Sequence, residues 1–183
     1  MRDALRNLSD SKYWVYGPST YEFDSVVELI QKYSDYADEC IDRRTSDAEV
    51  PAEFEEAHAE VSSDLRYYCY IEKGLLWSFA LWRLQGMFEA LLASHYLRGT
   101  QMRRLGLKGK LRALREAGYE LPIAQQEELL RWAALRNLLS HMPPEHYHPI
   151  AVDREDMEEF VVLLKSVCAV LSKQRSTVLA NEL

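Results

Sequence analysis

The residue types best suited to acid–base chemistry lie in the stretch Leu129–Met142, which reads LLRWAALRNLLSHM. Its last two turns carry Arg136, Asn137 and His141. An imidazole gains and loses a proton near neutral pH, whereas a guanidinium stays charged and grips phosphate with paired N–H donors. With an amide to orient either group, these types fit phosphodiester cleavage, in which one proton is removed and another is supplied.

A helix would place these groups where a ligand could reach them. At helical spacing, Asn137 and His141 share one face. Arg136 lies about 100° around the axis from Asn137, beside Ser140, to which we assign a supporting role. Pro143-Pro144 should end the helix directly after His141, so we expect the imidazole in the last turn of the helix, facing outward.

Two other interpretations of these residues remain open. Unpaired polar groups in an apolar site are costly, so Arg136, Asn137 and His141 could form a buried network that ties helices together. His141 could also join His146 and His148 in a metal site, but no acidic or cysteine ligand joins them at metal spacing. We therefore expect no bound metal.

The composition indicates an all-α protein. The chain has 183 residues, 48% of them hydrophobic, with only 7 Gly and 6 Pro. A β-sandwich or barrel would need more turn residues and more β-branched runs. No apolar run reaches the ~18 residues of a membrane span, and the N-terminus has no signal-peptide core, so we expect a cytoplasmic protein. The three cysteines Cys40, Cys69 and Cys168 are odd in number and far apart, which fits buried thiols better than disulfides or a zinc site.

The charge is distributed unevenly along the chain. A formal net charge of −7 argues against non-specific binding of nucleic acid by the whole surface. The segment 98–115, however, contains basic residues and no acidic one. Its basic members are Arg98, Arg103, Arg104, Lys108, Lys110, Arg112 and Arg115. Such a patch on an acidic body can follow a phosphate backbone.

The first half of the chain reads as an arm followed by long helices. Residues 1–18 are the arm, and a helix is expected over 19–41. As one helix, the next apolar region, 52–97, would be longer than ~60 Å, so we expect a break or bend near Lys73-Gly74. The half 75–97 is apolar on nearly all sides and should be the central helix.

The apolar residues of region 52–97 form two stripes that should face the core. The stripes are Phe54, Val61, Leu65 and Tyr68, then Leu75, Phe79, Trp82 and Met87. The second half also carries the aromatic residues Trp77, Phe79, Trp82 and Phe88. Such side chains fit a core or a dimer interface better than a base-stacking platform. Glu89 is a polar exception, which we place behind the site as a candidate partner of Arg136.

Three further helices complete the expected bundle. They are predicted over 108–117, 122–142 and 153–172. Gly118 should end the first of them, and Asp153 should cap the last. We treat residues 1–183 as one domain, in which 75–172 form the core bundle, 19–74 are additional helices and 173–183 are a polar tail.

The segment Arg136-Asn137-Leu138-Leu139-Ser140-His141 resembles the R-N-x-x-x-H motif of the HEPN family, because it ends a bundle helix and precedes a loop and an apolar final helix. The resemblance covers about Leu75–Leu171. It implies an antiparallel bundle of four to five helices, here with additional N-terminal helices. Members with an intact motif are typically metal-independent endoribonucleases of toxin–antitoxin and anti-phage defence systems.

The resemblance also implies roles for individual residues. His141 would perform acid–base work, Arg136 would hold the scissile phosphate, and Asn137 would orient the phosphate or His141. One His cannot perform both proton transfers, so a homodimer that joins two motifs across one cleft is expected. No cofactor is implied, and the basic segment 98–115 would guide the RNA.

The resemblance is incomplete at one position. Family members paired with a nucleotidyltransferase antitoxin commonly carry a Tyr two residues after the His, and this chain has Pro143 there. Control by that kind of antitoxin is therefore not implied, although another antitoxin or defence-system partner is compatible with the motif. The alternative function is a non-catalytic HEPN-like module that binds a protein partner or a nucleotide and uses the same residues structurally.

Overall fold

The computed structural model describes residues 20–46, 51, 54–97, 105–141 and 152–180. Within these ranges all regular structure is helical, which confirms the all-α prediction. The elements are α2 (Tyr21–Arg44), α3 (Glu55–Leu91), the π-helical turn η3 (Leu92–Tyr96), α4 (Leu107–Glu116), α5 (Ile123–His141) and α6 (Arg154–Ala180). The predicted arm 1–18 lies outside the described residues.

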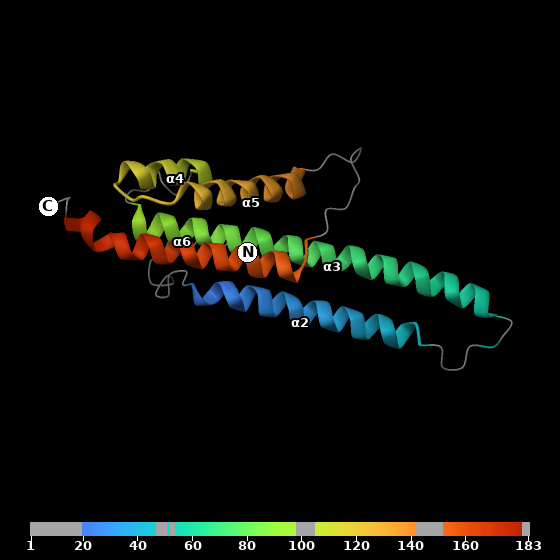
Figure 1. Cartoon of the computed structure of the whole chain (residues 1–183). Coiled ribbons are helices and arrows are strands. Elements are labelled where there is room, and N and C mark those ends of the chain that lie inside the picture. The colour runs from blue at the N-terminus through green and yellow to red at the C-terminus, as the bar shows by residue number, and fades with distance from the viewer. Residues whose placement is uncertain (1–19, 47–50, 52–53, 98–104, 142–151, 181–183) are drawn as a thin grey trace, which may run out of the picture.

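The helices lie roughly along one direction (Figure 1). α2 and α5 run antiparallel to α3 and α6, and α4 lies beside the first half of α5. The α2–α3 hairpin is the longest part of the molecule, and its far end extends beyond the other helices (Figure 1). Within the described part of the chain, no helix is both long and apolar enough to cross a membrane.

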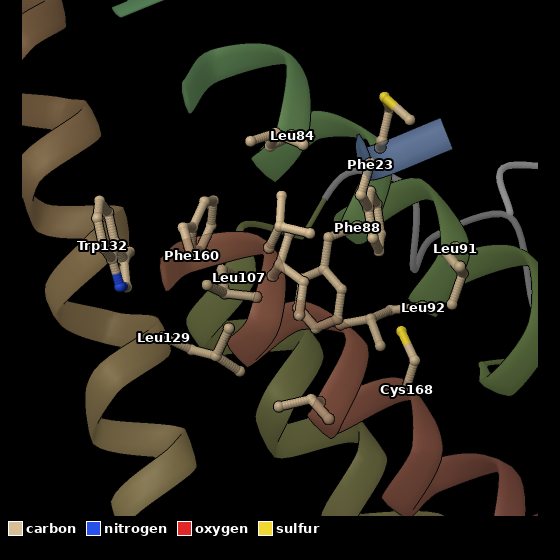
Figure 2. Close-up of a cluster of buried hydrophobic side chains, with 14 of the residues drawn as sticks. Phe23, Leu84, Phe88, Leu91, Leu92, Leu107, Leu129, Trp132, Phe160 and Cys168 are labelled. Carbon is tan, nitrogen blue, oxygen red and sulfur yellow. The ribbon is translucent and has the colours of Figure 1, made fainter. Parts of the chain in front are cut away.

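The hydrophobic core lies where α2, α3, α5 and α6 meet, with α4 closing one end (Figure 2). Phe23 of α2, Phe88 of α3 and Leu129 of α5 are fully buried there. Trp132 of α5 stacks on Phe160 of α6, with ring centroids 4.7 Å apart. Since burying one such side chain contributes about 1.5–3 kcal/mol, this contact fixes α5 on α6.

The predicted break at Lys73-Gly74 is wrong, because α3 is one continuous helix of 37 residues. A glycine inside a helix costs only about 1 kcal/mol relative to alanine. Packing on both sides of Gly74 outweighs this cost, since Cys69 and Trp77 are both buried. Lys73 also donates a hydrogen bond to Asp38 of α2, with 2.6 Å between Nζ and Oδ2.

The core face of α3 differs from the predicted stripes. Trp77 and Phe88 are buried as expected, together with Leu81 and Leu84. Most members of the predicted stripes are exposed instead, namely Phe54, Val61, Tyr68, Leu75, Phe79 and Trp82. These six residues therefore lie on a side of α3 that the described part of the chain leaves uncovered, whereas Met87 is buried and Leu65 half-buried.

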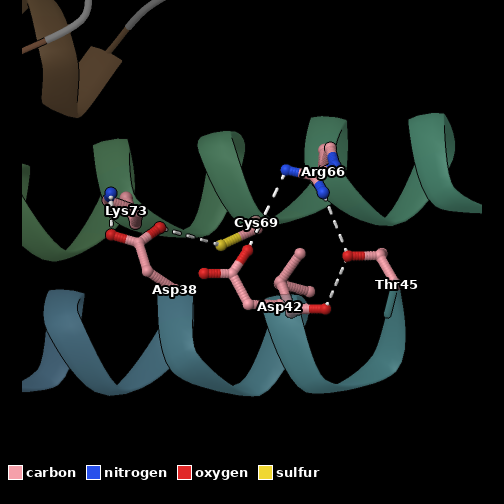
Figure 3. Close-up of polar contacts among 7 residues, drawn as sticks. Asp38, Asp42, Thr45, Arg66, Cys69 and Lys73 are labelled. Carbon is pink, nitrogen blue, oxygen red and sulfur yellow. Dashed lines mark hydrogen bonds and ion pairs between the residues drawn. The ribbon is translucent and has the colours of Figure 1, made fainter. Parts of the chain in front are cut away.

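Polar contacts hold the far end of the α2–α3 hairpin together (Figure 3). Arg66 of α3 donates to the Thr45 hydroxyl at 3.1 Å, and that hydroxyl donates to the Ile41 carbonyl at 2.9 Å. Cys69 lies against Asp38, with 4.0 Å between Sγ and Oδ1. Burial, and secondly the charge of Asp38, raises the pKa of this thiol.

The other two cysteines are also free thiols. Cys168 is buried in the core, and this burial raises its pKa to about 11. Cys40 is half-buried.

Two predicted helix ends have the expected local chemistry. Gly118 follows α4 with a φ of 88°, and Tyr119 N–H donates to the Leu114 carbonyl at 3.0 Å, as in a Schellman cap. Asp153 caps α6 reciprocally, because each of Asp153 and Asp156 accepts the other's backbone N–H at 3.1 Å. α6 then continues to Ala180, so most of the segment expected to be a polar tail is helical.

Candidate functional site

α5 carries the three motif residues at its C-terminal end. The helix is held from one side, where Leu129 and Trp132 are buried. Leu135 and Leu139 pack partly against the same core. The last turns of α5 therefore pack against the bundle through one side, and their opposite side faces solvent.

Two of the motif residues, Asn137 and His141, lie on that open side. Asn137 and His141 are exposed, and Arg136 is half-buried. Arg136 Nη1 donates to Asn137 Oδ1 at 3.1 Å. Among the described residues, no carboxylate pairs with Arg136 and His141 makes no hydrogen bond or ion pair. This arrangement leaves a guanidinium and an imidazole open to a ligand, and it does not fit a buried network between helices.

Ser140 has a local role in this arrangement. Its hydroxyl donates to the carbonyl of Arg136, one helical turn earlier, at 2.8 Å. The Ser140 side chain is exposed, and this hydrogen bond ties it to the backbone of Arg136. It is placed to order the last turn of α5.

Glu89 does not lie against Arg136 as the sequence suggested. Its Oε2 pairs with Lys110 Nζ of α4 at 2.6 Å, and its Oε1 accepts from Gln85 at 2.9 Å. Lys110 is buried and also donates to the carbonyl of Leu105. This pair joins α3 to α4, and Lys110 is therefore removed from the surface available to a phosphate backbone.

The basic segment is divided by the fold. Lys108, Arg112 and Arg115 are exposed on α4, and they line a groove of about 450 Å³ whose other wall is formed by Gln126 and Leu130 of α5. Arg112 has one weak partner, Glu116, at 3.7 Å with both side chains mostly exposed. Arg98, Arg103 and Arg104 lie outside the described residues.

The basic groove and two of the motif residues, Asn137 and His141, share one face of α5. Gln126, Leu130, Asn137 and His141 follow one another at spacings that return to one side of a helix. At a rise of 1.5 Å per residue, Leu130 and His141 are about 16 Å apart along the axis. One helix face therefore runs from the exposed cations of α4, past the half-buried Gln126 and Leu130, to the exposed imidazole.

A second groove, of about 760 Å³, lies between α2 and α6 and contains none of the motif residues. Four of the charged residues that line it form two ion pairs, Lys165 with Asp24 and Arg154 with Glu158. It has no part in the candidate site. Among the described residues, no cluster of His, Cys, Asp and Glu could hold a metal ion; His146 and His148 lie outside them.

Compared with known proteins, the chain matches no family model, no curated protein and no solved structure.

Sequence reasoning found the motif but not its surroundings. The shared face of Gln126, Leu130, Asn137 and His141 is visible in the spacing. The groove beside it is not, because its basic wall comes from α4 and depends on how α4 packs on α5.

Proposed function

We propose that the protein is a HEPN-like endoribonuclease that cleaves RNA without a metal ion, and that it acts in the cytoplasm as a toxin or anti-phage defence effector. The observation that carries this proposal is the face of α5 on which the basic groove leads to Asn137 and His141, with the half-buried Arg136 beside Asn137. RNA would lie along this face, with its phosphates on Lys108, Arg112 and Arg115.

The chemistry follows from the residue types. The ribose 2′-hydroxyl attacks the adjacent phosphorus, a base removes its proton, and an acid protonates the leaving 5′-oxygen. Arg136 stabilises the charge that builds up on the phosphate, and Asn137, bound to Arg136 at 3.1 Å, holds the guanidinium in place. His141 performs one of the proton transfers.

The second proton transfer requires a second motif. A homodimer that places two copies of His141 at one cleft supplies both a base and an acid, without any metal or cofactor. The proposal therefore includes a homodimer, and an antitoxin or defence-system partner remains compatible with it.

Replacement of His141 by Ala separates this enzyme from a non-catalytic binding module. Wild type is expected to cleave labelled total RNA and tRNA in EDTA, and His141→Ala should lose activity by about 10²-fold or more, the range of a lost acid–base group. His95→Ala removes another exposed imidazole and should cleave like wild type.

Thermal melting completes this test. Because His141 is exposed and makes no hydrogen bond or ion pair among the described residues, His141→Ala should melt at the wild-type temperature. Folded wild-type protein that leaves RNA intact in EDTA, or a His141→Ala variant of full activity, would move the assignment to the binding module.

A further inference from the structure

The exposed apolar residues of α3 follow a seven-residue repeat. One set recurs at every seventh position, namely Phe54, Val61, Tyr68, Leu75 and Trp82. A second set lies four residues after members of the first and contains Leu65, Glu72, Phe79 and Gly86. Alternating steps of four and three residues are the pattern of a coiled-coil seam. We call these nine residues the α3 seam.

The α3 seam lies on the side of the helix turned away from the bundle. Cys69, Trp77, Leu84 and Phe88 are the buried residues that face α2, α5 and α6. The seam members Phe54, Val61, Tyr68, Leu75 and Phe79 are 54–63% exposed. No described segment of the chain covers them, and an apolar stripe of this length on a helix is typical of a contact with another helix.

We propose that the α3 seam binds the same seam of a second copy of this chain, with the two helices antiparallel. An antiparallel pair brings each residue of one set opposite a residue of the other set. Centring the twofold axis between Tyr68 and Glu72 places the Tyr68 hydroxyl against the Glu72 carboxylate of the partner subunit.

Three further layers of this register are complementary in size, whereas Trp82 lies opposite His58 of the partner subunit. Val61 meets Phe79 of the partner subunit, and Leu65 meets Leu75 of the partner subunit. Phe54 meets Gly86 of the partner subunit, where no side chain competes for space; even a Cβ at Gly86 would have no neighbour within 4 Å in the single chain. In these three layers a large side chain faces a small one or another apolar one.

The charges beside the seam favour the antiparallel direction. The first turns of α3 carry Glu55 and Glu56, and Arg83 lies near its other end without an ion pair among the described residues. Antiparallel pairing brings Glu55 close to Arg83 of the partner subunit. Parallel pairing would instead bring Glu72 against its own copy inside the seam, and like charges in that position repel.

The area is adequate for a stable contact. At about 100 Å² each, roughly half of what a fully covered aromatic side chain buries, the exposed apolar seam residues offer about 600 Å² per chain. Flanking side chains raise the area buried per chain close to the ~800 Å² per partner of a typical specific interface.

The proposal goes beyond the proposed function and rests on the geometry of α3 alone. The α3 seam faces away from the bundle that carries α5, so this contact is separate from a cleft that joins two copies of His141. Dimerisation and RNA cleavage are separate measurements, so the failure of one is distinguishable from the failure of the other.

Light scattering coupled to size-exclusion chromatography tests the dimer on the full chain. Wild type should have twice the chain mass of 21.3 kDa. The double variant Leu75→Arg/Phe79→Arg should have the mass of one chain, and Tyr70→Arg, a matched change of an exposed residue off the seam, should stay dimeric. Monomeric wild type, or a double variant that remains dimeric, would overturn the proposal.

A charge exchange tests the direction of pairing and does not rely on the fold surviving two arginines. Arg83→Glu should weaken the dimer by at least tenfold in dissociation constant, because it faces Glu55 of the partner subunit. Arg83→Glu/Glu55→Arg should restore wild-type affinity. If the second change brings no recovery, the antiparallel register is wrong.

Discussion

Two groups of polar residues in this protein have opposite surroundings. Lys110 and Glu89 form a buried pair, with side chains 4% and 15% exposed, that joins α4 to α3. Arg136, Asn137 and His141 project from the end of α5 with only a local hydrogen bond among them. The first group therefore serves the fold, and the second is available for a ligand.

Removal of Lys110 should destabilise the protein strongly. Lys110→Ala leaves the Glu89 carboxylate largely buried and without its cation, which typically costs 3–5 kcal/mol. Denaturant unfolding should show a loss of about 3 kcal/mol relative to wild type. Lys108→Ala, two residues away and exposed, should change stability by less than about 0.5 kcal/mol. Equal effects of the two changes would show that the buried pair contributes no more than a surface lysine.

For individual residues, helical spacing in the sequence predicted part of the site. The exposed face shared by Asn137 and His141 follows directly from helical periodicity. The position of Lys110 could not be predicted, because a lysine is buried only where another element brings a carboxylate to it, and Glu89 lies on α3.

Among the helices, α3 connects the core of the molecule to the α2–α3 hairpin. It packs on the core through its C-terminal half and on α2 along its N-terminal half. The sequence predicted most helices closely, including the Gly118 and Asp153 ends, because caps are local. The break predicted at Gly74 is wrong, because the local preferences of glycine do not include the packing of Cys69 and Trp77 against other helices.

Glycines in two conformations should respond oppositely to alanine. Gly74→Ala should stabilise the protein by up to about 1 kcal/mol, because the residue is helical and an added Cβ meets no atom within 4 Å. Gly118→Ala should destabilise it by about 1 kcal/mol or more, because φ is +88° there. Thermal melting of the two variants measures both signs. A loss of stability in Gly74→Ala would indicate that α3 bends at this position.

The whole molecule combines an acidic chain with one basic groove. The net charge is −7, yet Lys108, Arg112 and Arg115 share the α4–α5 groove, which continues on the motif-bearing face of α5. This distribution favours a nucleic acid held at one place over binding to the surface in general.

Neutralising the groove should reduce the salt dependence of RNA binding. In a His141→Ala background, which keeps the RNA intact, Lys108→Ala/Arg112→Ala/Arg115→Ala removes three phosphate contacts. The slope of log K against log salt should fall by about 2 in magnitude for single-stranded RNA. Arg43→Ala/Arg44→Ala, at the far end of α2, should leave the slope unchanged. An unchanged slope in the groove variant would place the RNA elsewhere.

The central claim is that this chain cleaves RNA by attack of the ribose 2′-hydroxyl. The most direct measurement compares an RNA oligonucleotide with the same sequence carrying 2′-deoxyribose at the cleaved position, both incubated with wild-type protein in EDTA. The account predicts cleavage of the RNA, with a 2′,3′-cyclic phosphate on the upstream fragment, and no cleavage of the deoxy substrate. Cleavage of both substrates at the same position, or cleavage that appears only with added Mg²⁺, would contradict it.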